Sequence, residues 1–144
     1  MKIFTIGFTK KSAEEFFSRL QDAGVRRVVD VRLNNTSQIA GFAKARDLVF
    51  FLKAIAGIDY IHVPELAPTQ DLLDDFVKAK GAWSDYERRF KQLMETRRIA
   101  ETLSKGLLDG GCLLCSENTP EHCHRRLVAE HLQTHWANVE IVHL

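Results

Sequence analysis

Short apolar runs alternate along the chain with longer segments in which apolar residues recur every three or four positions. A short apolar run bounded by glycine, proline or polar residues is typical of a strand buried inside a sheet. We therefore expect five β-strands. They span Lys2–Phe8, Val25–Leu33, Tyr60–Val63, Cys112–Ser116 and Val139–Leu144.

The segments between these runs have the spacing of helices. Ser12-Ala-Glu-Glu15 is a capping box, in which Ser12 bonds the Glu15 amide, and the helix that it opens ends at Gly24. Ser84-Asp-Tyr-Glu87 repeats the pattern and predicts the start of a longer helix. Thr119 and Pro120 have the preferences of an N-cap and a first helical residue. The predicted helices span about 12–23, 44–56, 69–79, 84–106 and 119–136.

Strands and helices alternate along most of the chain, which is typical of a mostly parallel sheet covered by helices on both faces. We expect an α/β three-layer sandwich with a five-stranded, Rossmann-like sheet. A length of 144 residues suits a single domain over residues 1–144. In such folds ligands bind beyond the carboxyl ends of the strands, so candidate site residues are sought there.

Composition narrows the possible classes of protein. Apolar residues make up 45% and charged residues 27%, an ordinary globular balance. The net charge of +1 does not favour bulk attraction to nucleic acid, although a local basic patch is compatible with it. No apolar stretch is long enough for a membrane span. Three cysteines without a secretion signal indicate reduced thiols and a cytoplasmic location.

The second predicted strand carries Asp30 and Arg32, which share a face because they are two residues apart. A carboxylate among valines must be paired or hydrogen-bonded, so one interpretation is a structural ion pair. The functional interpretation makes Arg32 a fork for phosphate or carboxylate and Asp30 a general base or orienting group. Further ligand-binding candidates follow the first and second strands, namely Thr9, Asn34 and Lys44.

The stretch CSENTPEHCHRR, residues 115–126, is crowded with reactive groups. We expect Glu117 to be an acid-base group, and Cys123 and His124 to be a nucleophile or proton carrier, because helix N-termini favour thiolates. Arg125 and Cys115 are predicted to contact the ligand, with Arg125 holding an anion at that helix end. The alternative for Cys123 is a small buried core residue, and the alternative for Arg125 is a solvated surface charge.

A metal interpretation of the same stretch is also possible. Cys115, Cys123 and His124 together would supply three zinc ligands. The C-x7-C-H spacing is not a standard zinc pattern, and Cys112 points away from Cys115 on the strand. We therefore expect no metal site. Walker, dinucleotide and cysteine-phosphatase patterns are missing from the sequence as well.

Several segments together resemble the family catalogued as domain of unknown function 488. They are TIGFTKKSAEEFF, VVDVRLNNTSQIAGFAK, HVPELAPT, CLLCSENTPEHCHRRLVAEHL and VEIVHL. The specific motifs are Asp30-Val31-Arg32 and Cys123-His124-Arg125. The resemblance implies a small cytoplasmic bacterial or archaeal α/β domain. Many members carry His or Tyr after the first-strand glycine, where this chain has Phe8.

The leading hypothesis is an enzyme that binds an anionic small molecule, a nucleotide or a nucleic-acid end and catalyses hydrolysis or glycosidic transfer. A non-catalytic module that senses a nucleotide or binds nucleic acid is the second hypothesis. A Cys/His metal or redox protein is the third. Trp83 and Tyr86 are expected to pack in the core, or else to form one wall of the site.

Overall fold

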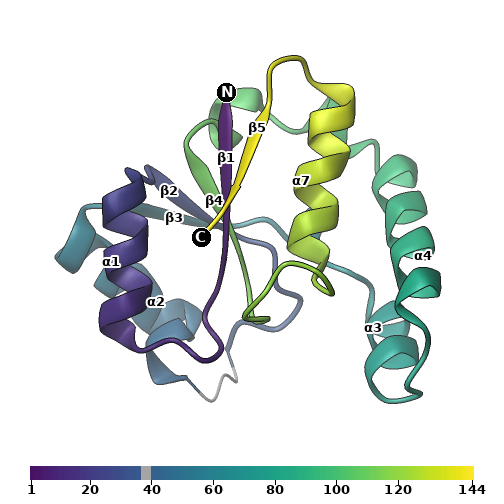
Figure 1. Cartoon of the computed structure of the whole chain (residues 1–144), viewed down its shortest axis with the longest axis horizontal. Helices are drawn as coiled ribbons and strands as arrows, with labels where there is room; N and C mark the ends of the chain where they lie inside the picture. The colour runs from purple at the N-terminus through teal and green to yellow at the C-terminus, as the bar shows by residue number, and fades with distance from the viewer. Residues whose placement is uncertain (37–39) are drawn as a thin grey trace.

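The computed structural model describes residues 1–36 and 40–144 (Figure 1). Its strands form one five-stranded sheet in the order β3-β2-β4-β1-β5, and every neighbouring pair is parallel. The predicted parallel α/β sheet is therefore confirmed. The strands are β1 (Lys2–Gly7), β2 (Arg27–Asp30), β3 (Asp59–His62), β4 (Gly111–Cys115) and β5 (Glu140–His143).

Helices cover both faces of the sheet, which confirms the three layers. The helices α1 (Ala13–Ala23) and α2 (Ala45–Phe51) lie on one side, and α3 (Gln70–Val77), α4 (Trp83–Thr96) and α7 (His124–His135) lie on the other (Figure 1). The core has two parts accordingly, because alternate strand residues point to opposite faces. The shorter elements are η1 (Gly41–Ala43), η2 (Leu52–Ala56), η3 (Pro64–Leu66), α5 (Ile99–Thr102) and α6 (Lys105–Leu108).

Two adjacent residues of β1 illustrate this division. Ile3 packs in the cluster that α4 and α7 cover, whereas Phe4 packs in the cluster that α1 and α2 cover. The two cysteines of β4 divide in the same way, with Cys115 in the first cluster and Cys112 in the second. The prediction that these thiols face opposite sides of the sheet is confirmed.

In the described part of the chain, none of the helices has the length and hydropathy that a membrane crossing requires.

The strand β2 ends earlier than its apolar pattern predicts. The predicted strand reaches Leu33, but the strand ends at Asp30. The Asp30 carboxylate accepts a hydrogen bond from the backbone amide of Arg32 at 3.1 Å. The amide of Arg32 would otherwise pair with a neighbouring strand. Because it donates to the Asp30 side chain instead, the backbone leaves the sheet.

The last helix begins later than predicted. Instead of starting at Thr119 and Pro120, α7 begins at His124 with Cys123 as its N-cap residue, in extended conformation. The guanidinium of Arg125 donates to the carbonyl oxygen of Glu117 at 2.6 Å. That bond holds the chain before the helix as a loop, so the favourable Thr-Pro pair does not open a helix.

The long helix predicted over residues 84–106 is also wrong in its limits. The helix α4 begins at Trp83 after the N-cap residue Ala82, without a side-chain cap, so the second capping box does not form. Arg98 adopts a left-handed conformation with φ 55°, which ends the helical path. The chain continues in the short helices α5 and α6, whose Ile99 and Leu108 are buried in the core.

These caps give a first test of the fold. The Thr69 hydroxyl accepts a hydrogen bond from the Leu72 amide at 3.2 Å and caps α3. We expect Thr69→Ala to lower the free energy of unfolding by about 1 kcal/mol. Ser84→Ala, at an exposed position with no capping bond, should change it by less than about 0.5 kcal/mol. Urea unfolding measures both, and equal losses would contradict the observed helix starts.

Candidate functional site

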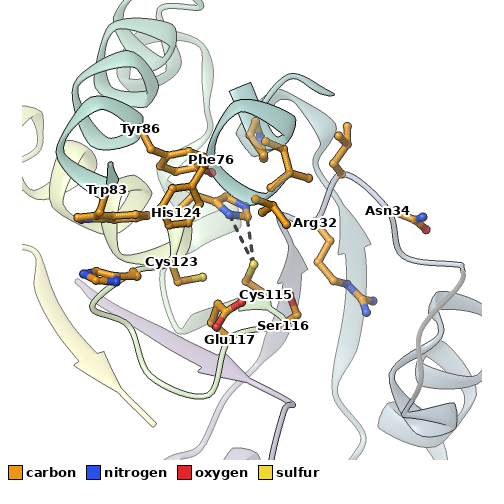
Figure 2. A pocket seen from close by; sticks show the side chains of 15 residues that line it. Arg32, Asn34, Phe76, Trp83, Tyr86, Cys115, Ser116, Glu117, Cys123 and His124 are labelled. Carbon is orange, nitrogen blue, oxygen red and sulfur yellow. Dashed lines mark hydrogen bonds between the residues drawn. The ribbon is translucent and has the colours of Figure 1, made fainter. Parts of the chain in front are cut away.

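A pocket of about 240 Å³ lies beyond the carboxyl ends of β2 and β4, against α3, α4 and the start of α7 (Figure 2). The strand order predicts a ligand site here. The neighbouring strands β2 and β4 are followed by helices on opposite faces of the sheet, α2 and α7, and ligands bind where the chain diverges in this way. Six of the predicted site residues line it: Arg32, Asn34, Cys115, Glu117, Cys123 and His124. Its other lining residues are Leu33, Pro68, Leu73, Phe76, Val77, Trp83, Tyr86, Ser116 and His122.

A thiol and an imidazole meet in the wall of this pocket. Cys115, the last residue of β4, places its Sγ 3.5 Å from Nδ1 of His124, the first residue of α7 (Figure 2). The other ring nitrogen, Nε2, lies 2.7 Å from the carbonyl oxygen of Val31. Since that oxygen only accepts hydrogen bonds, Nε2 carries the hydrogen, and Nδ1 of the neutral ring is an acceptor that faces the thiol.

The surroundings of Cys115 favour its thiolate. A hydrogen bond from the Cys123 thiol lowers the pKa of Cys115, and this effect outweighs the opposing effect of burial. The amide and hydroxyl of Ser116 and the charge of Arg125 act in the same direction. Burial, together with the neighbouring Cys115, raises the pKa of Cys123 well above its usual range. The directions of these pKa shifts favour Cys115 as the thiolate. The sequence had predicted Cys123 instead, from its place at the start of the last helix.

The third cysteine differs from these two. Cys112 lies on the other face of β4, and burial raises its pKa far above that of a free thiol. It does not line the pocket. Cys112 is therefore a core residue and an internal reference for the reactivity of the other thiols.

The same groups have the spacing of metal ligands. The ligand atoms of Cys115, Cys123 and His124 all lie within 4.8 Å of one another. Zinc bond lengths place a sulfur and a nitrogen ligand about 3.6 Å apart in a tetrahedral site, close to the observed Cys115–His124 separation. The bond from His124 Nε2 to a carbonyl is also typical of a metal-bound histidine. The unusual sequence spacing thus does not keep the three groups apart.

Asp30 and Arg32 form a buried, bidentate ion pair. Nε and Nη2 of Arg32 donate to the two carboxylate oxygens at 2.9 and 2.8 Å, and the Tyr60 hydroxyl donates to Oδ2 as well. Nη1 of Arg32 donates to the Ala43 carbonyl at 2.7 Å. Burial opposes ionisation of Asp30, but the hydrogen bonds and charge of Arg32 outweigh it and lower the pKa of that carboxyl. The hydrogen-bonding groups of the two side chains are therefore largely paired with each other.

This geometry bears on two predicted roles, which stay predictions. Asp30 is 0% exposed and does not line the pocket, so the structure favours the structural interpretation over a general base. Arg32 lines the pocket, but its guanidinium is held by Asp30 and Ala43. An incoming anion would have to compete with a buried carboxylate for the same donors.

Arg125 is also committed to the protein. It is 0% exposed, and it donates to the Thr5 hydroxyl at 3.3 Å and to the carbonyl oxygens of Glu117 and Asn118 at 2.6 and 3.5 Å. In the structure Arg125 fastens the loop after β4 to β1, and its role of holding an anion stays a prediction. Thr9 and Lys44 are exposed but lie outside the pocket lining.

The whole of this pocket falls within one known family. The family model described as "Domain of unknown function DUF488" matches residues 12–132. The chain belongs to the DUF488 family. The match includes every residue that lines the pocket, whereas β1 and β5 lie outside it. Comparison with curated protein sequences and with solved structures gave no match.

The DUF488 pocket also has an aromatic wall that the sequence indicated only as one of two options. Trp83 stacks on Tyr86 with ring centroids 5.0 Å apart, and on His122 at the same separation. Phe76 completes the wall, 5.1 Å from Tyr86, and all four residues line the pocket (Figure 2). Trp83 and Tyr86 thus pack together and also form a wall of the pocket. Phe76 was missed, although it lies on the apolar side of α3 with Leu72 and Leu73.

Proposed function

We propose that this DUF488 protein is a thiol-dependent enzyme in which Cys115 attacks an electrophilic carbon of a substrate bound in the pocket. The observation that carries the proposal is the contact between Cys115 and Nδ1 of His124, with Nε2 of the same ring held by Val31. A nucleophile, a base and a group that orients the base form the recurrent arrangement of covalent catalysis.

The groups present support a complete cycle of hydrolysis or group transfer. His124 takes the thiol proton, the sulfur of Cys115 bonds to the substrate carbon, and the bond from that carbon to the leaving group breaks. The imidazolium of His124 returns the proton to the leaving group. Water or another acceptor then loses a proton to His124, attacks the same carbon and releases the thiolate, which regains its proton from the imidazolium. Glu117, exposed at the pocket, is placed to contact the polar part of the substrate or the attacking water.

The pocket walls support a substrate with a planar or apolar portion. The predicted anion-binding arginines are held by Asp30 and by backbone carbonyls, so phosphate recognition has little support here. The stacked rings of Trp83 and Tyr86, with Phe76, offer an apolar surface instead. These features fit a substrate whose ring packs against the aromatic wall and whose carbonyl or glycosidic carbon is attacked by the thiol.

Alkylation with iodoacetamide tests the proposal without knowledge of the substrate. We expect Cys115 to be modified first, with a pH midpoint below the ordinary thiol pKa of about 8.5, because its thiolate is stabilised. Cys112 in the same molecule should stay unmodified until unfolding. Peptide mass spectrometry after timed quenching measures each site.

The base is tested by His124→Ala, which should raise the pH midpoint of Cys115 alkylation and slow it at pH 7 by about 10-fold or more, in line with the loss of a general base. The exposed His135→Ala, measured like the others in metal-free buffer, serves as a matched control and should leave the profile unchanged. If Cys115 titrated like a free thiol in both proteins, or if Cys123 reacted first, Cys115 would not be the nucleophile.

A second candidate function is a metal-dependent hydrolase, which the mutual spacing of Cys115, Cys123 and His124 favours. The three groups would hold a zinc ion, which would supply Lewis-acid chemistry at the pocket. Zinc should then protect Cys115 from iodoacetamide. Once a reaction is found, activation by zinc and loss with a chelator indicate the metal enzyme, whereas inhibition by zinc indicates the thiol enzyme.

A further inference from the structure

A second group of metal-ligating side chains lies between the later turns of α4 and α7. Glu95 comes from α4, and His131 and His135 come from α7, one helical turn apart. Their ligand atoms all lie within 4.8 Å of one another. His131 follows His124 by seven residues, so this cluster lies roughly 10 Å further along α7 than the pocket. It lines a separate surface groove.

The hydrogen bonds of His135 direct its second nitrogen toward the cluster. Nδ1 of His135 lies 2.9 Å from the backbone carbonyl oxygen of His131, so Nδ1 carries the hydrogen. Nε2 is then the lone-pair nitrogen of the neutral ring, and it lies 3.3 Å from Oε1 of Glu95. Two lone pairs at that distance repel each other unless a proton or a cation lies between them.

His131 adds a third ligand atom to the cluster, and a metal ion can bind three such atoms where a proton links two. Its Nδ1 lies 3.8 Å from the same oxygen of Glu95, and its side chain is only 7% exposed. The two imidazole rings are 4.4 Å apart at their centroids, so both can reach one ion.

The geometry also matches a particular ion. With zinc bond lengths of about 2.0 to 2.2 Å to nitrogen and oxygen, tetrahedral ligand atoms lie about 3.4 Å apart. The separations of 3.3 and 3.8 Å between Glu95 and the two histidines need only small rotations to reach that value. Both histidines lie near the carboxyl end of α7, where the helix dipole favours a cation. Lys91 is the lysine that lines this groove, and its positive charge is paired with Glu87 at 3.2 Å.

We propose that Glu95, His131 and His135 form a zinc site that joins α4 to α7, with water completing the coordination. The two helices carry opposite parts of the pocket, since α4 provides Trp83 and Tyr86 and α7 provides His124. A metal at the far end of this helix pair holds their separation and stabilises the fold. The site is independent of the proposed enzymatic function.

Zinc titration of the full chain with both pocket thiols replaced, Cys115→Ser and Cys123→Ser together, separates this site from the pocket. Calorimetry should give one zinc per chain. Zinc at about 100-fold its dissociation constant should raise the melting temperature by on the order of 5 °C. Cobalt(II) bound there should show no thiolate-to-metal charge-transfer absorption, because the ligands are nitrogen and oxygen.

Variants of the ligands decide the assignment. His135→Ala or Glu95→Gln, both at exposed positions, should weaken zinc binding by at least about 10-fold. Asp85→Asn, which removes an exposed carboxylate at the other end of α4, should leave zinc binding unchanged. If the double serine variant does not fold, the wild type should lose one zinc equivalent on His135→Ala. Zinc binding that is absent, or that is indifferent to His135 and Glu95, overturns the proposal.

Discussion

Asp30→Asn is expected to lower the free energy of unfolding by about 3 to 5 kcal/mol, the typical cost of removing one partner from a buried ion pair. The substitution keeps the shape of the side chain but leaves the Arg32 guanidinium, which is 3% exposed, without its counter-charge. The Tyr60 hydroxyl loses a charged acceptor at the same time. Urea unfolding at pH 7 measures the change.

A matched pair on the surface supplies the control. Asp59 and Lys53 form an ion pair at 2.9 Å whose side chains are 57% and 68% exposed. Solvent screens such a pair, so Asp59→Asn should have a much smaller effect than Asp30→Asn. Comparable losses from the two substitutions would show that the Asp30 pair does not carry the stability assigned to it.

The same ion pair predicts a dependence of stability on pH. The pKa of Asp30 in the folded protein is lowered, so between that value and the unfolded pKa of about 3.9 only the unfolded chain binds the proton. The contribution is fully present above about pH 4 and is lost as the pH falls through the folded pKa. Acid unfolding should therefore be shallower in Asp30→Asn than in the wild type. Parallel acid profiles would contradict this contribution.

Gly7→Ala is expected to cost about 4 kcal/mol or more, at the upper end of the range for single substitutions. A Cβ atom at Gly7 would lie 1.6 Å from the backbone oxygen of Glu117 and 2.9 Å from Nη1 of Arg125. The same oxygen accepts the hydrogen bond from Arg125, so the loop cannot withdraw without breaking it. The glycine is needed here for close approach of two backbone segments.

Gly41→Ala is the control for this substitution, because among the described residues nothing lies within 4 Å of a Cβ placed there. It should change the free energy of unfolding by no more than about 1 kcal/mol in either direction. Thermal unfolding compares the two variants under one set of conditions. A loss below about 1 kcal/mol for Gly7→Ala would mean that the loop after β4 moves freely away from β1.

The fold was predictable because its signals are local. The capping bond from the Glu15 amide to Ser12 forms as its four-residue pattern predicts, and Gly24 ends α1 in a left-handed conformation. Where a side chain from outside the segment intervenes, the local signal fails. Thr119 and Pro120 have ideal preferences for a helix start, but Arg125 holds the preceding carbonyls and keeps that segment in a loop.

The candidate site was only partly predictable for the same reason. The sequence shows that a carboxylate at Asp30 needs a partner, and Arg32 on the same face provides it. It does not show that the Arg32 guanidinium is also held by the Ala43 carbonyl, or that Asp30 lies outside the pocket lining. The bond from His124 to the Val31 carbonyl joins residues 93 positions apart, and it selects the ring nitrogen that faces Cys115. No periodicity or spacing rule contains that information.

The acceptor that orients His124 is a main-chain atom, and this has a genetic consequence. Every amino acid at position 31 supplies a backbone carbonyl oxygen, so a missense change there does not remove the acceptor itself, as replacing an acceptor side chain would. The vulnerable positions are the neighbours. Asp30 and Arg32 clamp the peptide on either side of Val31. In the proposed enzyme, alleles that loosen this clamp would misorient the His124 imidazole without changing it, and a genetic screen would record them as loss-of-function mutations.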